Sequence, residues 1–177
     1  MIPENHYCNK VQKLPKDDPN RIFHDTMYGF PAKDDNELFE RLMLEINQAG
    51  LNWSLIMNKL SNLRTAYDYF HLDRVASYID RDIDRLMKDP GIIRHPHKIK
   101  AAIYNAQKIM EIRSNHGSFD AWLTQHHPLT HDAWTRLFRS HFKFTGPEIV
   151  KEFLMGIGFL PGAHHPACPI YAQLPTR

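Results

Sequence analysis

Apolar residues recur at three- and four-residue intervals between residues 36 and 49, the spacing that places side chains on one face of an α-helix. This stripe consists of Leu38, Phe39, Leu42, Met43, Ile46 and Ala49. Asp34, followed three residues later by Glu37, resembles a capping box at the start of such a helix. Gly50 is suited to a left-handed end. The pattern predicts an amphipathic helix over about 36–48, followed by a short turn over 51–53.

Helical spacing also dominates the rest of the chain, and no alternating run indicates a β-strand. Proline and mixed charge predict an extended arm over 1–22, and the aromatic segment 23–31 is expected to be a loop. The further helices are expected at 53–70, from Asp73 to 79, from Asp80 or Asp82 to 87, and at 96–115, 119–125, 131–141 and 148–157. The prediction is an all-α protein of about eight or nine helices. In the helix over 96–115, Lys98 is placed on the outward face.

One domain spanning residues 1–177 is expected, since 177 residues suffice for one substantial core, or for two small helical lobes that share one. Met1 is not followed by an apolar segment of signal-peptide length, and no apolar run is long enough to cross a membrane. We therefore expect a soluble, intracellular protein. Residues 1–90 carry 12 Lys and Arg against 15 Asp and Glu, a net charge of −3, whereas residues 91–177 carry 10 against 5, a net charge of +5. The second half is the better candidate for a nucleic-acid face.

Glu45 lies inside the apolar stripe, seven residues after Leu38 and three after Leu42. A carboxylate in that position must be paired, bind a cation or remain protonated, because an unpaired buried charge is very costly. One interpretation is a pocket in which Glu45 lies beside Leu51 and Trp53. The alternative is a core glutamate that backbone donors satisfy, with Trp53 as ordinary packing.

Two cysteines and two histidines near the ends of the chain form a candidate metal site. Cys8 and His24 are separated by fifteen residues, and His164 and Cys168 by three. Two thiolates and two imidazoles complete a closed tetrahedral zinc site, whose role would be structural. The alternatives are accidental spacing among 12 histidines, or a disulfide between the cysteines in an oxidising compartment. His165 lies next to His164, but only His164 is separated from Cys168 by three residues.

The segment 137–147 joins a basic helix to the last helix through a tight turn containing Gly146. Backbone amides of such a turn, together with the positive N-terminal end of the next helix, can hold a phosphate, aided by Lys143. The alternative is a plain helical hairpin with an incidental lysine. The hairpin element is expected over about 132–158.

Two stretches resemble the 3-methyladenine DNA glycosylase I family, a bacterial base-excision repair family built on the helix-hairpin-helix scaffold. They are Leu44-Glu45-x-x-Gln48-Ala49-Gly50-Leu51-x-Trp53 and Gly91-Ile92-Ile93-Arg94-His95-x-x-Lys98-Ile99. The likeness extends, with gaps, from about Phe23 to Cys168. It implies a monofunctional glycosylase that flips a nucleotide out of double-stranded DNA containing alkylated bases and hydrolyses the N-glycosidic bond of 3-methyladenine. It also implies a structural zinc clasp, with Cys8, His24, His164 and Cys168 as ligands. A member of this family is expected to be a monomer in the bacterial cytoplasm, where it associates with the nucleoid.

The resemblance assigns roles to the residues around the predicted pocket. Glu45 accepts hydrogen bonds from the cationic base and balances its charge, and Trp53 stacks on it. Phe23 and Tyr28 complete the base pocket. Gly50 and Leu51 are expected to contact the DNA, with Leu51 inserted as a wedge into the duplex. Lys143 and Gly146 are expected to contact it at the hairpin. The absence of Asp and Glu after Glu152 agrees with the 3-methyladenine branch and argues against a lyase.

Several positions depart from the family pattern. Phe23 stands where the family usually has tyrosine, which removes a hydroxyl at the base, and Met27 and Tyr28 stand where it has an acid and tryptophan. Asn47 and Asn52 replace Gln and Ser, and the segment between Trp122 and His131 is short. Three alternatives therefore stay open: a shifted damaged-base substrate, a non-catalytic DNA-binding protein, and a zinc hydrolase, which would need an open position on the metal.

Overall fold

The structure is a computed structural model that describes residues 1–175, and the secondary structure within them is entirely helical. The α-helices are α1 (Tyr7–Gln12), α2 (Pro19–Thr26), α3 (Asp35–Gln48), α4 (Trp53–Asn58), α5 (Leu60–Ala66), α6 (Leu72–Ala76), α7 (Asp80–Lys88), α8 (Pro96–His116), α9 (Phe119–His126), α10 (His131–His141) and α11 (Pro147–Gly156). Two 3-10 helices, η1 (Asp68–Phe70) and η2 (Tyr171–Gln173), complete the described part. The all-α prediction is confirmed.

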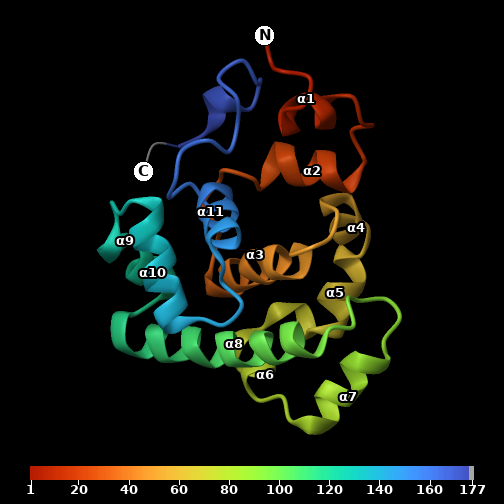
Figure 1. Ribbon diagram of the computed structural model, residues 1–177, viewed down its shortest axis with the longest axis vertical. Helices are drawn as coiled ribbons and strands as arrows, with labels where there is room; N and C mark the ends of the chain where they lie inside the picture. The colour runs from red at the N-terminus through yellow and green to blue at the C-terminus, as the bar shows by residue number, and fades with distance from the viewer. Residues whose placement is uncertain (176–177) are drawn as a thin grey trace.

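The helices surround a central pair formed by α3 and α11, which pack against each other (Figure 1). The longest helix, α8, runs across one end of the molecule, with α9 and α10 on one side and α4 and α5 on the other. The opposite end holds α1, α2 and the C-terminal segment, so segments from both ends of the sequence lie side by side there. This arrangement places residues from both ends of the sequence around the C-terminal half of α3.

The predicted amphipathic helix forms as α3, one residue longer at its start, and its stripe packs into the core. Asp34 caps it, since its side chain accepts a hydrogen bond from the Glu37 amide at 2.8 Å. Leu38, Phe39, Leu42, Met43 and Ile46 are at most 1% exposed. Burying each such side chain stabilises the fold by roughly 1.5–3 kcal/mol. Helices on several sides cover α3, so ten of its residues are buried, including polar ones outside the stripe.

The expected extended arm over 1–22 is wrong, because two helices form there. The His6 side chain accepts a hydrogen bond from the Cys8 amide to start α1, and Asp18 caps α2. Pro19 occupies the first turn of α2, where a missing N–H is harmless, rather than marking an extended chain. Helix α2 also continues to Thr26, into the segment expected to be a loop.

The single helix expected over 53–70 is also wrong, because it is divided into α4, α5 and η1. The division between α4 and α5 falls at Lys59, which leaves helical geometry with φ −98° and ψ 0°. Its ammonium donates to the carbonyls of Pro90 and Gly91 at 3.2 and 3.0 Å. Tyr69 then turns into left-handed geometry at φ 54°. With α1 and α2 added, the described residues form eleven α-helices rather than eight or nine.

Lys98 points inward, which is opposite to its predicted orientation. It is 3% exposed, and its ammonium donates to the carbonyls of Asn47 and Ala49, each at 2.8 Å. These carbonyls lie at the C-terminal end of α3, where the helix dipole favours a cation. Burial lowers the pKa of Lys98. The lysine therefore fixes the end of α3 just before Gly50.

Arg41 joins three segments that are distant in the sequence. Its Nη1 donates to the carbonyls of Met27 at 2.9 Å, Phe30 at 2.6 Å and Gly156 at 3.1 Å. An ion pair with Glu37 balances its charge, and the residue is 5% exposed. One buried guanidinium thus attaches the segment after α2 and the end of α11 to α3.

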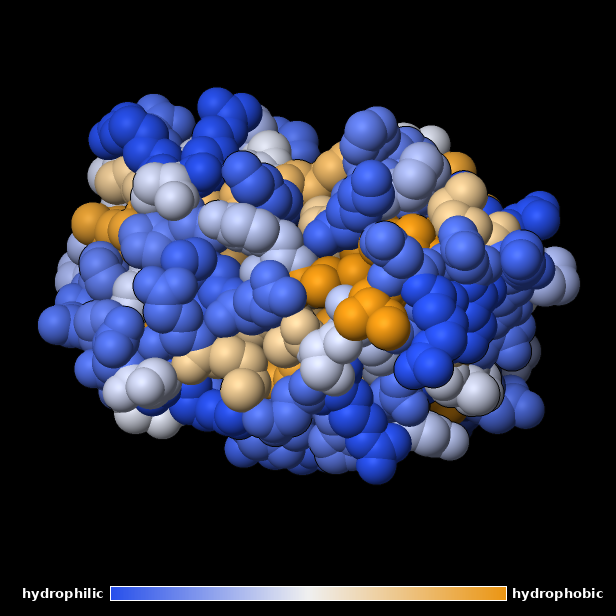
Figure 2. Space-filling view, turned by 90° about the horizontal axis from the view of Figure 1, so that it is seen from below, coloured by the Kyte–Doolittle hydropathy of each residue, from blue (hydrophilic) through white to orange (hydrophobic). Residues whose placement is uncertain are grey.

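The hydropathy of the surface and of the helices adds two facts. Seen from below, the molecule is mostly hydrophilic, with hydrophobic residues gathered near the middle of that face (Figure 2). Within the described residues, no helix combines the length and hydrophobicity that crossing a bilayer requires.

Replacing Arg41 by methionine is expected to destabilise the protein by roughly 3–5 kcal/mol, because it leaves the largely buried Glu37 carboxylate without its ion-pair partner and removes one donor from each of three backbone carbonyls. Urea unfolding measures this change. The control is Arg113→Met, since Arg113 pairs with Asp73 at the surface and should contribute less than about 1 kcal/mol. Equal losses in the two variants would contradict the role given to Arg41.

Candidate active site

A cavity of about 760 Å³ opens beside the C-terminal half of α3, and most of the predicted site residues line it. Residues from α1, α2, α3, α4 and α11 form its wall. Of the residues predicted from the sequence, it brings together Phe23, Tyr28, Glu45, Gly50, Leu51, Trp53 and Gly146. Among the residues predicted to bind the base or the DNA, Lys143 is the exception, because it lies outside this cavity.

Glu45 is 7% exposed, and within the described residues no group donates a hydrogen bond to its carboxylate. The alternative of a core glutamate satisfied by backbone donors is therefore not what the structure shows. Burial, and then the charge of Glu152, raise the pKa of Glu45 to about 8. A buried carboxyl with no partner, facing a cavity, is typical of a functional site.

Aromatic rings form the side walls of the cavity. Trp53 and Phe23 meet edge to face, with ring centroids 5.0 Å apart. Tyr28 lies 6.0 Å from Phe23 and 5.7 Å from Tyr7, measured between ring centroids. These rings can enclose a planar ligand of purine size, leaving the carboxyl of Glu45 as the polar group beside it.

Glu152 on α11 and Tyr7 on α1 are among the lining residues that the sequence analysis did not assign to the site. The hydroxyl of Tyr28 donates to Glu152 Oε2 at 3.0 Å, across 124 residues of sequence. The only signal for Glu152 was its place in the helix that follows Gly146. The only signal for Tyr7 was that it precedes Cys8 in the sequence, because a residue next to a metal ligand lies near the metal site.

The turn between α3 and α4 presents Leu51 at the mouth of the cavity. Gly50 adopts φ 78°, the left-handed conformation that was predicted for the helix end. Leu51 is 39% exposed. Asn52 caps α4 by accepting a hydrogen bond from the Ser54 amide at 2.8 Å, so Trp53 starts a helix rather than lying in a turn. Both ends of this short turn are therefore fixed.

Helices α10 and α11 form the predicted hairpin, with Gly146 at the start of α11. Asn105 of α8 binds the backbone of Lys143 twice, accepting from its amide at 2.8 Å and donating to its carbonyl at 3.0 Å. That amide is thus not free for a phosphate, while the Lys143 ammonium lies over the Tyr104 ring. Phe144, at φ 63° and 38% exposed, forms the tip of the turn.

The four predicted metal ligands, Cys8, His24, His164 and Cys168, come together and are all buried. Their candidate ligand atoms all lie within 4.8 Å of one another. His164 Nδ1 is 3.7 Å from both sulfurs, and His24 Nε2 is 3.8 Å from Cys168 Sγ. A tetrahedral zinc ion with ordinary bond lengths would give nitrogen–sulfur separations of about 3.6 Å. The group can hold a metal ion with little movement.

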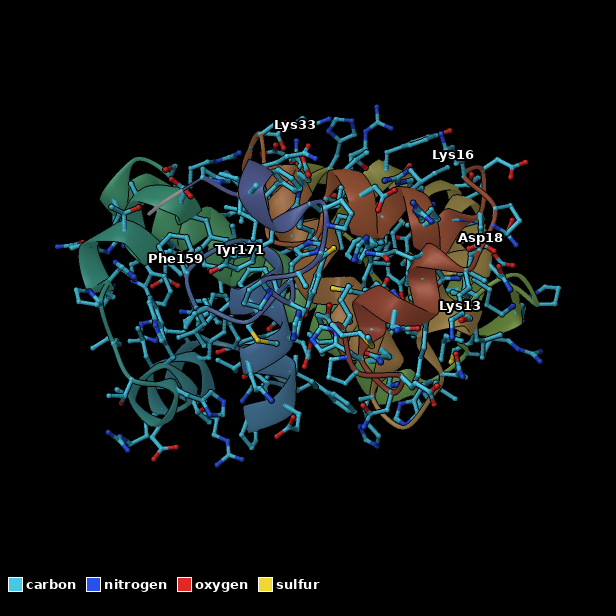
Figure 3. The ribbon with its side chains drawn as sticks, turned by 90° about the horizontal axis from the view of Figure 1, so that it is seen from above. Lys13, Lys16, Asp18, Lys33, Phe159 and Tyr171 are labelled. Atoms are coloured by element: carbon cyan, nitrogen blue, oxygen red, sulfur yellow. The ribbon has the colours of Figure 1, made fainter. Side chains whose placement is uncertain are left out.

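Hydrogen bonds to the outer nitrogens orient the two imidazoles. His24 Nδ1 contacts Asp25 Oδ1 at 2.6 Å, and Asp25 in turn pairs with Arg21. His164 Nε2 contacts the Tyr28 carbonyl at 2.8 Å. Partners of this kind fix which nitrogen faces a metal. Viewed from above, helices α1 and α2, whose connection carries Lys13, Lys16 and Asp18, lie beside the C-terminal segment that carries Tyr171, and the cluster joins the two (Figure 3).

The raised pKa of Glu45 has a consequence for stability. Its pKa is about 8 in the folded state, whereas that of an ordinary glutamate is 4.5, so the folded protein binds more protons between these values, and its stability falls as the pH rises through this range. The Glu45→Gln variant lacks this carboxyl, so it should not lose stability in this way as the pH rises. Relative to the wild type, the variant should gain on the order of 2–4 kcal/mol in free energy of unfolding between pH 5 and pH 8. Urea titrations at both pH values measure it, and a constant difference would contradict the assignment.

Comparison with known proteins agrees with this geometry. A family model described as methyladenine glycosylase matches residues 14–136. The DNA-3-methyladenine glycosylase 1 of Escherichia coli (strain K12) is 32% identical over 168 residues, which cover 84% of this chain and 89% of that protein. The solved 3-methyladenine DNA glycosylase I of Staphylococcus aureus superposes with a TM-score of 0.80 at 30% identity, covering 97% of this chain and 100% of that one. A solved Tyr-to-Phe variant of a 3-methyladenine DNA glycosylase I, in complex with 3-methyladenine, gives a TM-score of 0.77 at 31% identity, covering 89% and 94% of the two chains. The chain belongs to the methyladenine glycosylase family.

Proposed function

We propose that this protein is a DNA-3-methyladenine glycosylase that hydrolyses the N-glycosidic bond of 3-methyladenine in alkylated double-stranded DNA. The observation that carries the proposal is the unpaired carboxyl of Glu45, buried beside an aromatic cavity large enough for a purine. The names of the E. coli and S. aureus relatives support the same substrate.

The charge of the lesion matches the state of the pocket. A nucleotide of 3-methyladenine carries a positive charge on its base, whereas the empty pocket holds Glu45 largely protonated at pH 7, since its pKa is about 8. A cationic base that enters favours the ionised carboxylate and thus takes the place of the proton. Stacking on Trp53 adds a cation–π attraction of roughly 1–2 kcal/mol once water is excluded.

The chemistry asks little of the protein because the leaving group is already activated. The bond between the sugar C1′ and the base nitrogen breaks with its electron pair passing to the cationic ring, and the base leaves neutral. Water adds to C1′ and releases a proton. Binding and orienting the extruded nucleotide are therefore the main contributions of Glu45 and Trp53. This reaction needs no Schiff base, in keeping with the absence of Lys and Arg from the residues that line the cavity.

The DNA-binding elements flank the mouth of the cavity. Leu51 fills the space that the flipped nucleotide leaves in the duplex, and Gly50 permits the tight turn that presents it. The N-terminal end of α11 at Gly146 and the side chain of Lys143 bind the phosphate backbone, which is the helix-hairpin-helix use of this element.

The metal is zinc, and its role is structural. The Cys8, His24, His164 and Cys168 group fits its ligand preference, and a set of four protein ligands leaves no open position for water. In this form the metal joins α1 and α2 to the C-terminal segment. A zinc hydrolase would need an open position, so that alternative is set aside.

The second candidate is a glycosylase with a shifted damaged-base substrate, favoured by Phe23, whose ring carries no hydroxyl at the cavity. In one solved relative, removing a tyrosine hydroxyl still permits a complex with 3-methyladenine. A non-catalytic DNA-binding protein would bind lesion DNA without releasing base. Measuring free base released from methylated duplex DNA, with 3-methyladenine resolved from 7-methylguanine, separates these three possibilities.

Glu45→Gln should lower the rate of 3-methyladenine release by about 100-fold, because it removes the negative charge that the cationic base needs. Single-turnover release from methylated DNA measures the effect. The matched control is Glu40→Gln on the same helix, since Glu40 pairs with Arg64 outside the cavity and its replacement should change release by less than a few-fold. Unchanged release in Glu45→Gln would remove Glu45 from the mechanism.

The zinc proposal is tested with two neighbouring histidines. The wild type should contain one zinc ion per chain, and His164→Ala should lose it and unfold at a temperature lower by roughly 10 °C. His165→Ala should retain the metal, because His165 is outside the four-residue cluster. Elemental analysis and thermal unfolding, with and without a chelator, measure both. Full metal content in His164→Ala would exclude the assigned ligands.

A further inference from the structure

Glu152 is a second acid in the base cavity, on the helix that packs against the one carrying Glu45. It lies on α11, and Glu45 lies on α3. Its Oε2 accepts the hydroxyl hydrogen of Tyr28 at 3.0 Å, and no other hydrogen bond to Glu152 is present within the described residues. Tyr28 itself is 8% exposed. The tyrosine therefore fixes one oxygen of Glu152 and leaves the other free to accept from a ligand.

Among the described residues that line the cavity, no lysine or arginine balances these acids. Its described lining holds three glutamates, Glu45, Glu148 and Glu152, together with His6, and no lysine or arginine. Glu148 differs from the other two, because its side chain is 80% exposed and lies 3.9 Å from the ammonium of Lys151. Glu45 and Glu152 thus form the unbalanced pair.

The charge of a carboxylate disfavours ionisation of a buried carboxyl that shares an enclosed space with it. Consistent with this, the charge of Glu152 is the second cause, after burial, of the raised pKa of Glu45. A positively charged ligand relieves the repulsion, whereas a neutral ligand of the same shape does not. The pair therefore selects for charge as well as for shape.

We propose that Glu152, positioned by Tyr28, is a specificity-determining residue that makes the cavity prefer positively charged purines over neutral purines. This inference rests on the proposed glycosylase function and adds a residue that selects for the positive charge of its substrate. A carboxylate that attracts a charge spread over the whole ring is less sensitive to which ring nitrogen carries the alkyl group. Tyr28 and Glu152 also compensate for the hydroxyl that Phe23 lacks, because together they supply a polar contact from another wall of the cavity.

The test compares a cationic probe with a neutral one at pH 8. The cation is 3,9-dimethyladeninium, in which a methyl group replaces the sugar, and the neutral probe is free 3-methyladenine. Quenching of tryptophan fluorescence gives both dissociation constants. The wild type should bind the cation more tightly, and in Glu152→Gln the ratio of the two affinities should fall by about tenfold to a hundredfold, the range expected for losing a charge-assisted hydrogen bond.

The matched control is Glu148→Gln, which removes the same charge from the same helix at an exposed position. Its affinity ratio should change by no more than about threefold. Tyr28→Phe keeps the carboxylate of Glu152 but removes the hydrogen bond that positions it. The affinity ratio of this variant should therefore lie between those of the wild type and Glu152→Gln. An unchanged ratio in Glu152→Gln, or an equal fall in Glu148→Gln, would overturn the inference.

A pH profile distinguishes this role from a merely structural one. The ionisable groups that face Glu45 and Glu152 are His6 and Tyr7 from α1, Tyr28 after α2, and Glu148 on α11. Removing the charge of Glu152 should move the Glu45 midpoint, followed through cation binding, to lower pH in Glu152→Gln but not in Glu148→Gln. A midpoint that does not move would also overturn the inference.

Failure of this inference and failure of the proposed function have different signatures. A wild-type protein that releases no 3-methyladenine from DNA would refute the glycosylase function, while the preference for the cation would still be measurable. Normal release, together with an affinity ratio that Glu152→Gln leaves unchanged, would refute the role of Glu152 alone.

Discussion

The buried guanidinium of Arg41 is the interaction on which the cavity depends. It binds the carbonyls of Met27 and Phe30, which flank Tyr28, and the carbonyl of Gly156 at the end of α11, the helix that carries Glu152. Because Arg41 itself lies one turn before Glu45 on α3, one side chain sets the relative positions of the three segments that supply the polar groups of the site. Its charge is balanced by Glu37, away from the cavity, so it does not neutralise the acids that face the ligand.

This arrangement keeps a destabilising carboxyl group where function needs it. Nothing in the described structure pairs with the carboxyl of Glu45, and Glu152 makes its ionisation still harder. A core optimised for stability would place an apolar residue there or provide a donor. A site for a cationic base benefits from an unpaired carboxyl, because the ligand supplies the opposite charge. The free-energy cost of desolvating the carboxyl has already been offset by folding.

The cluster at the chain ends is connected to the same cavity through one residue. The backbone carbonyl of Tyr28 contacts His164 of the cluster, while the hydroxyl of Tyr28 donates to Glu152. A metal ion that fixes His164 therefore also fixes the wall of the base pocket. In this way two short N-terminal helices and an irregular C-terminal segment, which have little core of their own, can contribute to a precise site.

Local spacing in the sequence was enough to determine α3, the place of Glu45 within its apolar stripe, the left-handed end at Gly50 and the hairpin around Gly146. It also identified the four residues of the Cys–His cluster. These features depend on neighbours three or four residues apart, on turn chemistry or on residue types suited to one ligand. Only the tertiary structure decided that Lys98 points inward, that the chain breaks at Lys59, and that Tyr7 and Glu152 line the cavity. The reason is physical: Tyr28 and Glu152 are 124 residues apart, and such a contact leaves no periodic trace in either segment because it exists only once the helices have packed.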